Sequence, residues 1–255
     1  MEDEQTQYGI VKKMPVRDLL RVPHKNGRLV VGYPAFGPDT YSGNLAEMQK
    51  KHFHSEEQSG IFFREPTTSE SISACAYNFE ELAKPEILDT LAWLQLGRIV
   101  RTSKGVFVNP PKDSEGNPIT NEKILMQLLN GVKETNGIYL AEDNANLRDF
   151  GYAPYESFER GIQDCDIFLR SGLARLLEHT EEEVAKNLRE ISWPKFYFRG
   201  FSVRGFNPVN EPVLSVAGLD SPKIIGSDRL NVGGYNLIDD SGRGHAFGVL
   251  NSEKS

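Results

Sequence analysis

The densest group of potential metal ligands in the sequence lies in the polar segment 51–57, which reads Lys-His-Phe-His-Ser-Glu-Glu. On a β-strand, His52 and His54 would point to the same face, and Glu56 would continue the row. Imidazole nitrogens and carboxylate oxygens are common zinc ligands. The pattern therefore suggests a metal-dependent hydrolase, with Glu56 or Glu65 as a further ligand or as the base. On a helix the same spacing would separate the two imidazoles, and the segment would be a solvated surface.

A second pattern combines arginine, glycine and aromatic residues near the C-terminus. Segment 199–206 reads Arg-Gly-Phe-Ser-Val-Arg-Gly-Phe, and a glycine-rich run follows at 242–248. Arginine and aromatic residues are favoured at interfaces. The candidate binding residues are Arg199, Phe201, Arg204, Phe206, Arg243 and His245. Such residues can also stack on single-stranded nucleic acid, whereas a sheet with a half-buried aromatic face would need no ligand.

Two glycine-rich segments fail as nucleotide-binding motifs. Gly32 and Gly37 have the spacing of a phosphate-binding loop, but Pro38 and Asp39 stand where lysine and serine or threonine are required. The run 242–248 has one residue too many for the dinucleotide fingerprint and leaves too little chain for the helix and strand that must follow. The sequence therefore identifies no cofactor.

A capping-box pattern predicts the start of a helix at Thr67. Glu70 stands three residues later and is placed to reach back to the backbone of Thr67. Ser69, Ser71 and Ser73 could include a nucleophile, but no partner histidine is marked, and serine is common near helix starts. The catalytic residues stay unidentified, and it stays open whether the chain is an enzyme.

The longest helical pattern runs from Tyr155 to Ile191. Its apolar residues fall three or four positions apart, which favours one buried helix face: Phe158, Ile162, Cys165, Leu169, Leu173 and Leu176. The pattern predicts a helix over 155–178 and a second helix, capped at Thr180, that ends at Ile191. Gly172 either permits a close approach of another element or marks a break.

These elements predict an α+β fold. Its helices are concentrated between about residues 67 and 191, its N-terminal strands are short, and its C-terminal part is rich in β-structure and glycine. Segments 98–101 and 106–108 predict a β-hairpin. Because helical periodicity ends near Trp193, residues 1–193 are predicted to form a mixed α/β domain. Residues 194–255 form a separate β-rich region or complete the same domain.

Composition limits the function classes. The chain of 255 residues has a formal charge of −7, which argues against broad nucleic-acid binding without excluding a local basic patch. No apolar run approaches the roughly 20 residues that span a bilayer, and an acidic N-terminus argues against a secretory signal. Cys75 and Cys165 are expected to be buried free thiols.

The resulting hypothesis is a soluble, cytoplasmic binding or interaction protein that uses the Arg/aromatic/Gly-rich C-terminal β surface. Its partner would be a protein or a small molecule, and no membrane contact is expected. The alternatives are the metal-dependent hydrolase that uses His52 and His54 and, on weaker grounds, a nucleic-acid-binding protein.

Overall fold

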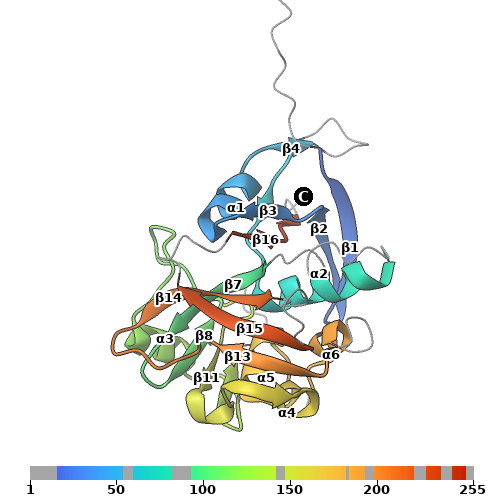
Figure 1. The fold of residues 1–255 in the computed structure, drawn as a ribbon. Coiled ribbons are helices and arrows are strands. Elements are labelled where there is room, and N and C mark those ends of the chain that lie inside the picture. Colours follow the sequence, from blue (N-terminus) through green and yellow to red (C-terminus); the bar gives the residue numbers. More distant parts are fainter. Residues whose placement is uncertain are drawn as a thin grey trace, which may run out of the picture.

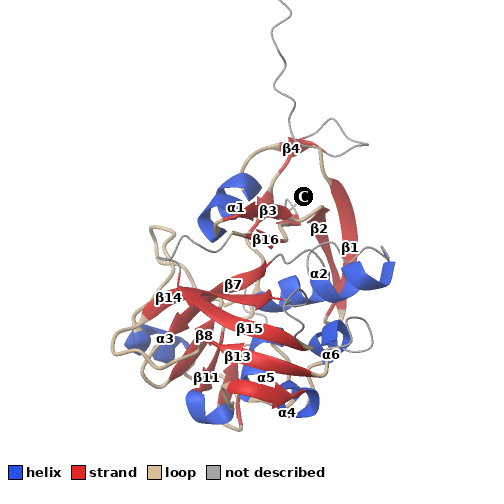
Figure 2. Cartoon of the chain, viewed as in Figure 1, coloured by secondary structure: helices blue, strands red, loops and turns tan. Residues whose placement is uncertain are grey.

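The structure is a computed structural model, and it describes residues 16–53, 60–81, 93–141, 147–181, 184–192, 198–220, 228–236 and 243–250. Of the described residues, 42% lie in strands and 25% in helices, and the helices are short (Figure 2). The chain is therefore dominated by sheets. The predicted α+β fold with a central helical segment over residues 67–191 is wrong.

The architecture is built around one sheet of eleven strands (Figure 1). Nine of them follow one another across the sheet in the order β12 (Gly161–Asp164), β13 (Gly200–Arg204), β15 (Arg229–Asn236), β14 (Val213–Asp220), β7 (Trp93–Arg101), β8 (Gly105–Val108), β11 (Gly151–Pro154), β10 (Ile138–Leu140) and β9 (Glu134–Thr135). Two more lie beside this path: β16 (Gly244–Ala246), which pairs with β7, and β3 (Phe36–Asp39), which pairs with β16. Neighbouring strands are antiparallel except for the pairs β13–β15 and β16–β7.

The predicted hairpin is confirmed as β7 and β8, which pair antiparallel with Ile99 opposite Val108. The Thr102 hydroxyl closes its turn by accepting a hydrogen bond from the backbone of Gly105 at 3.2 Å. On its other side β7 pairs with β14, so strands from both sides of Trp193 in the sequence share one sheet.

Strand β8 shows how the sheet separates two cores. Val106 and Val108 belong to the larger hydrophobic cluster and Phe107 to a smaller one, because successive side chains on a strand point to opposite faces. All four residues of β8 are buried, so both faces are covered. The larger cluster is covered by α2 (Thr68–Glu81), α4 (Cys165–Leu169), α5 (Gly172–Glu178) and α6 (Lys186–Glu190), and the smaller one by α3 (Glu122–Leu128).

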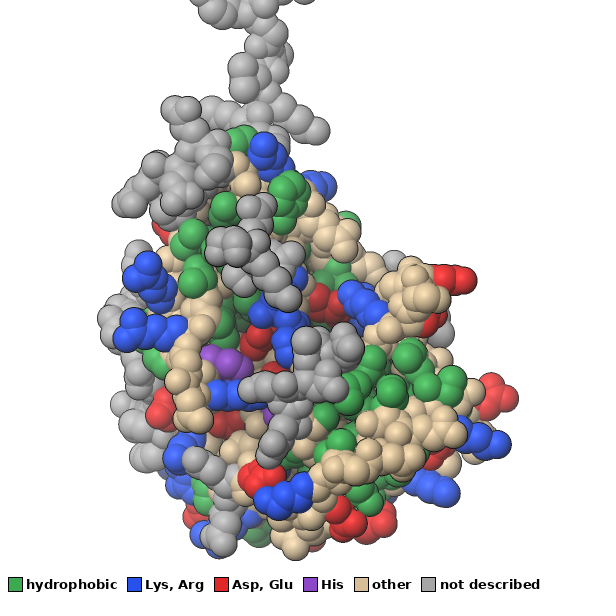
Figure 3. Space-filling view, turned by 180° about the vertical axis from the view of Figure 1, so that it is seen from behind, with side chains coloured by type: hydrophobic (Ala, Val, Ile, Leu, Met, Phe, Trp, Pro, Cys, Tyr) green, Lys and Arg blue, Asp and Glu red, His purple; other side chains and the backbone are tan. Residues whose placement is uncertain are grey.

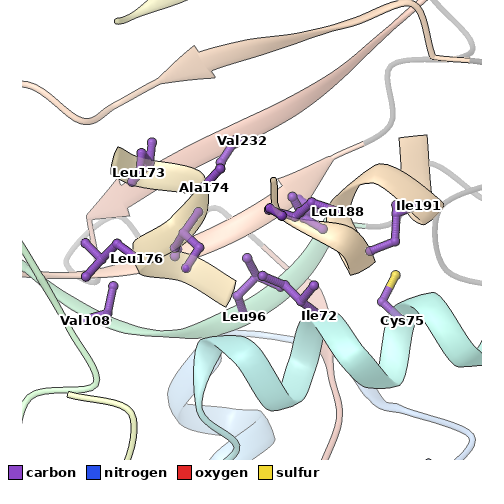
Figure 4. Close-up of a cluster of buried hydrophobic side chains, with 14 of the residues drawn as sticks. Ile72, Cys75, Leu96, Val108, Leu173, Ala174, Leu176, Leu188, Ile191 and Val232 are labelled. Atoms are coloured by element: carbon purple, nitrogen blue, oxygen red, sulfur yellow. The ribbon is translucent and has the colours of Figure 1, made fainter. Parts of the chain in front are cut away.

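The larger core joins helices to the sheet. Figure 4 shows Leu176 of α5 next to Val108, and Leu188 of α6 near Ile72 and Cys75 of α2. Cys75 is buried, as the sequence predicted, whereas Cys165 is only half-buried, and both are free thiols.

The segment 155–191 is not a pair of long helices. It divides into a 3₁₀ turn (Tyr155–Ser157), strand β12 and the helices α4, α5 and α6. Gly161 has a φ of +91°, which ends helical continuity, and Ser171 caps α5 by accepting a hydrogen bond from the Ala174 amide. A Cβ atom on Gly172 would lie 2.1 Å from Ser157 Oγ, so this glycine permits a close approach at the break. The apolar residues of these successive short elements stand three or four positions apart, which is the spacing that had predicted one continuous helix.

Two smaller sheets complete the fold. One contains β1 (Asp18–His24), β2 (Gly27–Tyr33), β17 (Val249–Leu250) and β6 (Phe63–Arg64), and the other contains β4 (His52–Phe53) and β5 (Gly60–Ile61). Helix α1 (Tyr41–Met48) packs there through a third hydrophobic cluster. Among the described residues, the helices are too short or too polar to cross a bilayer.

Candidate functional site

A cleft of about 580 Å³ opens between β6, the start of α2, the segment after β8, α3 and the segment before β11. Its charged lining residues are Arg64, Glu65, Arg98, Lys112 and Arg148, and its other lining residues are Pro66, Thr67, Asn109, Pro110, Pro111, Ile119, Leu128 and Leu147. Figure 3 shows basic and acidic side chains gathered near the middle of one face, with hydrophobic side chains beside them.

The capping box at the start of α2 is confirmed, and it also fixes one arginine of the cleft. The Thr67 amide donates to Glu70 Oε2 at 2.8 Å, and the Glu70 amide donates to Thr67 Oγ1 at 3.3 Å. Arg64 binds the same carboxylate through two hydrogen bonds of 2.7 and 2.9 Å. Burial on its own raises the pKa of Glu70, but the hydrogen bonds and charge of Arg64, together with the charge of Arg148, outweigh it and lower the pKa. Arg64 and Glu70 therefore neutralise each other.

Glu65 is the carboxylate that lines the cleft. Its Oε1 atom accepts a hydrogen bond from the Tyr41 hydroxyl at 2.7 Å and lies 3.0 Å from Arg98 Nε. Its Oε2 atom lies 3.4 Å from Lys112 Nζ, and the Lys112 side chain is half exposed. Burial, followed by the charge of Glu65, raises the pKa of Tyr41 well above its usual value, so the phenol keeps the proton that it donates.

Arg148 differs from the other cations because its nearest contact is a neutral group. One of its terminal nitrogens donates to the Glu65 carbonyl at 3.1 Å, and the same nitrogen is 3.8 Å from the Glu70 carboxylate, beyond hydrogen-bond range. Among the described residues, the cleft thus holds four cations against the carboxylates of Glu65 and Glu70, an excess of two positive charges.

The opposite side of the cleft is apolar. Ile119, Leu128 and Leu147 line it, and all three pack against the smaller hydrophobic core. A side wall of this kind beside an excess of positive charge can bind a molecule that has one anionic end and a hydrocarbon part.

Beneath one wall of the cleft, Asp149 is the centre of a buried hydrogen-bond cluster. Its carboxylate accepts hydrogen bonds of 2.5 Å from Thr67 Oγ1, Ser69 Oγ and Lys25 Nζ. Its own carbonyl accepts a hydrogen bond of 2.8 Å from the Asn109 side chain. Asp149 is 2% exposed and has a φ of +53°, so the surrounding contacts impose its backbone conformation. Because Arg148 directly precedes it, this cluster also positions the arginine in the cleft.

Lys25 is the cation that pairs with Asp149 at neutral pH. Burial raises the pKa of Asp149, but His179, Lys25 and the Ser69 hydroxyl outweigh this effect and hold the pKa well below its usual range. Burial lowers the pKa of His179, so its ring, whose Nδ1 is 3.7 Å from the Asp149 carboxylate, is neutral near pH 7. The Lys25 side chain is 32% exposed, whereas that of Asp149 is 3% exposed.

We expect the free energy of unfolding to fall as the pH is lowered from 7 to 5. Burial lowers the pKa values of His24 and His179 in the folded chain. The unfolded chain therefore binds protons below about pH 6.5 that the folded chain does not bind, and stability decreases. A further loss is expected below about pH 3.9, where Asp149 is protonated in the unfolded state first. Urea denaturation at pH 7, 6 and 5 measures the effect.

The control for this pH dependence is His179→Asn. Residue 179 has a φ of +50°, and asparagine tolerates this left-handed conformation without titrating. The slope of stability against pH between 7 and 5 should become shallower in this variant. An unchanged slope would contradict the assignment to His179.

The residues of the metal hypothesis are only partly described. His52 is fully buried, and its Nε2 donates to the Glu47 carbonyl at 2.9 Å, while Glu65 lies in the cleft. His54 and Glu56 lie outside the described residues. Within the described part of the chain, no group of three or more His, Cys, Asp or Glu residues is arranged to hold a metal ion. The metal hypothesis therefore stays a prediction.

The structure does not place the aromatic residues of the C-terminal pattern on a surface. Phe201 is fully buried and its ring centroid lies 4.2 Å from that of Phe168, and Phe206 is fully buried against Phe158. The other predicted binding residues are Arg199, Arg204 and Arg243, which are exposed, and His245, which is half-buried. Binding by these four stays a prediction.

Sequence reasoning missed Lys112, Arg148 and Asp149 as site residues. It had found the capping box at Thr67, the hairpin segment that begins at residue 98 and, for a different role, Glu65. The polar stretch around Arg148 carried no spacing signal, because its partners lie far away in the sequence: Glu65 and Ser69 are 80 or more residues distant, and Asn109 is 40 residues distant. Comparison with models of protein families, with curated proteins and with solved structures finds no match to this chain.

Proposed function

We propose that this protein binds a small organic anion in the cleft. The anionic group is held by Arg148 and Lys112, and the hydrocarbon part packs on Ile119, Leu128 and Leu147. The observation that carries the proposal is the surplus of two positive charges among the described residues of the cleft, beside an apolar wall. The surplus is local, since the chain as a whole has a charge of −7.

Two features support Arg148 as the main contact of the anionic group. Its guanidinium forms no hydrogen bond to a carboxylate among the described residues, and its side chain is 40% exposed. A guanidinium can present two parallel donors to a carboxylate, which gives both energy and orientation.

The test uses 2-naphthoate and its neutral amide, 2-naphthamide, as a matched pair of probes. We expect naphthoate to bind in calorimetric titrations and naphthamide to bind at least tenfold more weakly. Replacing Arg148 with Met keeps the aliphatic stem but removes the charge, and it should weaken naphthoate binding by about 10- to 100-fold, the effect of losing a charged hydrogen bond.

The matched control is Arg199→Met, because the Arg199 side chain is 81% exposed and belongs to the C-terminal segment rather than the cleft. It should leave naphthoate binding unchanged. Equal binding by wild type and Arg148→Met, or no binding of naphthoate at millimolar concentrations, would refute the proposed function. If only Arg199→Met weakened naphthoate binding, the result would instead support the C-terminal surface as the binding site.

A further inference from the structure

The apolar side of the cleft continues out of it along α3. Leu125 of this helix and Leu129 just after its end are buried, and Leu128 lines the cleft. Ile124 stands four residues before Leu128 and is 44% exposed. Residues four apart lie on the same helix face, about 6 Å apart along the axis. Ile124 therefore extends the apolar wall beyond the mouth of the cleft.

The charged side of the cleft favours a ligand group with one negative charge over a group with two. Arg64 is bound by Glu70, and Arg98 contacts Glu65 through Nε. The cations with the longest carboxylate contacts are Arg148, at 3.8 Å from Glu70, and Lys112, whose Nζ lies 3.4 Å from the Glu65 carboxylate. A dianionic group that reached Lys112 would place its second charge within a few ångströms of Glu65.

From these two observations we infer that the bound anion is a single-tailed amphiphile with a monoanionic head. Its head contacts Arg148, and its tail follows α3 from Leu128 to Ile124. Glu65 determines specificity by repelling heads that carry a second negative charge. The inference rests on the proposed function and names the ligand class of the same cleft.

The tail is tested with butanoate, hexanoate, octanoate and decanoate in calorimetric titrations. Affinity should rise about fourfold for each methylene that is buried. Ile124→Gln should reduce the increase in affinity from hexanoate to decanoate, and it should leave the affinity for butanoate unchanged. The control is Ile162→Gln, because Ile162 is 63% exposed on β12 and does not line the cleft. Both positions are exposed, so both variants should fold.

The head is tested with octanoate, octyl sulfate and octyl phosphate below their micelle concentrations at pH 7.5. The first two carry one negative charge and should bind at least tenfold more tightly than the phosphate, which is largely a dianion at this pH. Glu65→Gln keeps the size of the side chain, and it should reduce the difference in affinity between the monoanionic amphiphiles and octyl phosphate by about tenfold. Unfolding midpoints of each variant confirm that it is folded.

The outcomes separate the two proposals. If naphthoate binding depends on Arg148 but affinity is independent of tail length, the amphiphile inference is wrong and the proposed function stands. If octyl phosphate binds most tightly, the specificity role of Glu65 is wrong. If neither naphthoate nor the alkanoates bind, both proposals fail.

Discussion

Replacing Asp149 with alanine is expected to lower the free energy of unfolding by about 3–5 kcal/mol, because each buried donor that loses its acceptor costs about 1–3 kcal/mol. The substitution leaves the hydroxyls of Thr67 and Ser69 without their acceptor, and it leaves Lys25 without its carboxylate. Alanine must also adopt the φ of +53° that aspartate tolerates better. Chemical denaturation at pH 7 and 25 °C measures the loss.

Two controls separate the contributions at Asp149. Asp149→Asn tolerates the left-handed backbone and keeps one acceptor oxygen, so its loss should be smaller than that of alanine. Lys25→Met leaves the buried Asp149 carboxylate with its hydroxyl donors but without its cation, so it should cost more than the about 1 kcal/mol that is typical of an exposed ion pair. A loss of under 1 kcal/mol for Asp149→Ala would show that the cluster contributes little to the folded state.

The Asp149 cluster also connects stability to the candidate site. It joins the β1–β2 turn, the start of α2 and the segment before β11. Arg148 and Thr67, which both line the cleft, are parts of this junction. Asp149→Ala should therefore weaken naphthoate binding even in molecules that stay folded.

Local signals predicted the parts of the structure that depend on neighbouring residues. The capping box fixed the start of α2, and alternating apolar residues beside a polar turn gave the β7–β8 hairpin. Such features depend on contacts within a few residues, so their spacing is visible in the sequence.

Features that depend on distant contacts could not be predicted in this way. The pairing of β14 with β7 joins residues more than 100 positions apart, and Asp149 takes its hydroxyl partners from about 80 positions away. For the apolar residues from Phe158 to Leu176 the error is the opposite one, because the sequence pattern predicted a continuous helix that the structure does not contain. Apolar residues three or four apart matched one helix, but Gly161 and Ser171 divide that segment into a strand and two short helices.

The C-terminal pattern illustrates how one sequence can suggest either a surface or a core. The side chain of Phe201 points to one face of the sheet, and composition alone does not show whether that face is covered. Here α4 covers it, because the ring of Phe168 in this helix packs against that of Phe201 at a tilt of 31°. The exposed arginines on either side had made the whole segment resemble a contact surface.

Phe201→Ala should therefore act on folding rather than on binding. Phe201 is fully buried on β13, a strand between β12 and β15, and its removal leaves a cavity against Phe168. The expected loss is about 3–5 kcal/mol in the free energy of unfolding. Guanidinium denaturation measures this loss. Phe168→Ala and the double variant test the coupling between the two rings. Because the two residues are in contact, the loss of stability in the double variant should be smaller than the sum of the two single losses.

Arg204→Ala is the matched control on the same strand. Its side chain is exposed and contacts Ser202 Oγ at 3.0 Å, so its removal should change stability by less than about 0.5 kcal/mol. If the segment were instead a contact surface with an uncovered aromatic face, Phe201→Ala would leave stability nearly unchanged and reduce partner binding. The difference in stability between Phe201→Ala and Arg204→Ala thus decides whether this part of β13 belongs to a core or to a surface. Any binding defect of Phe201→Ala must be corrected for the fraction of unfolded chains.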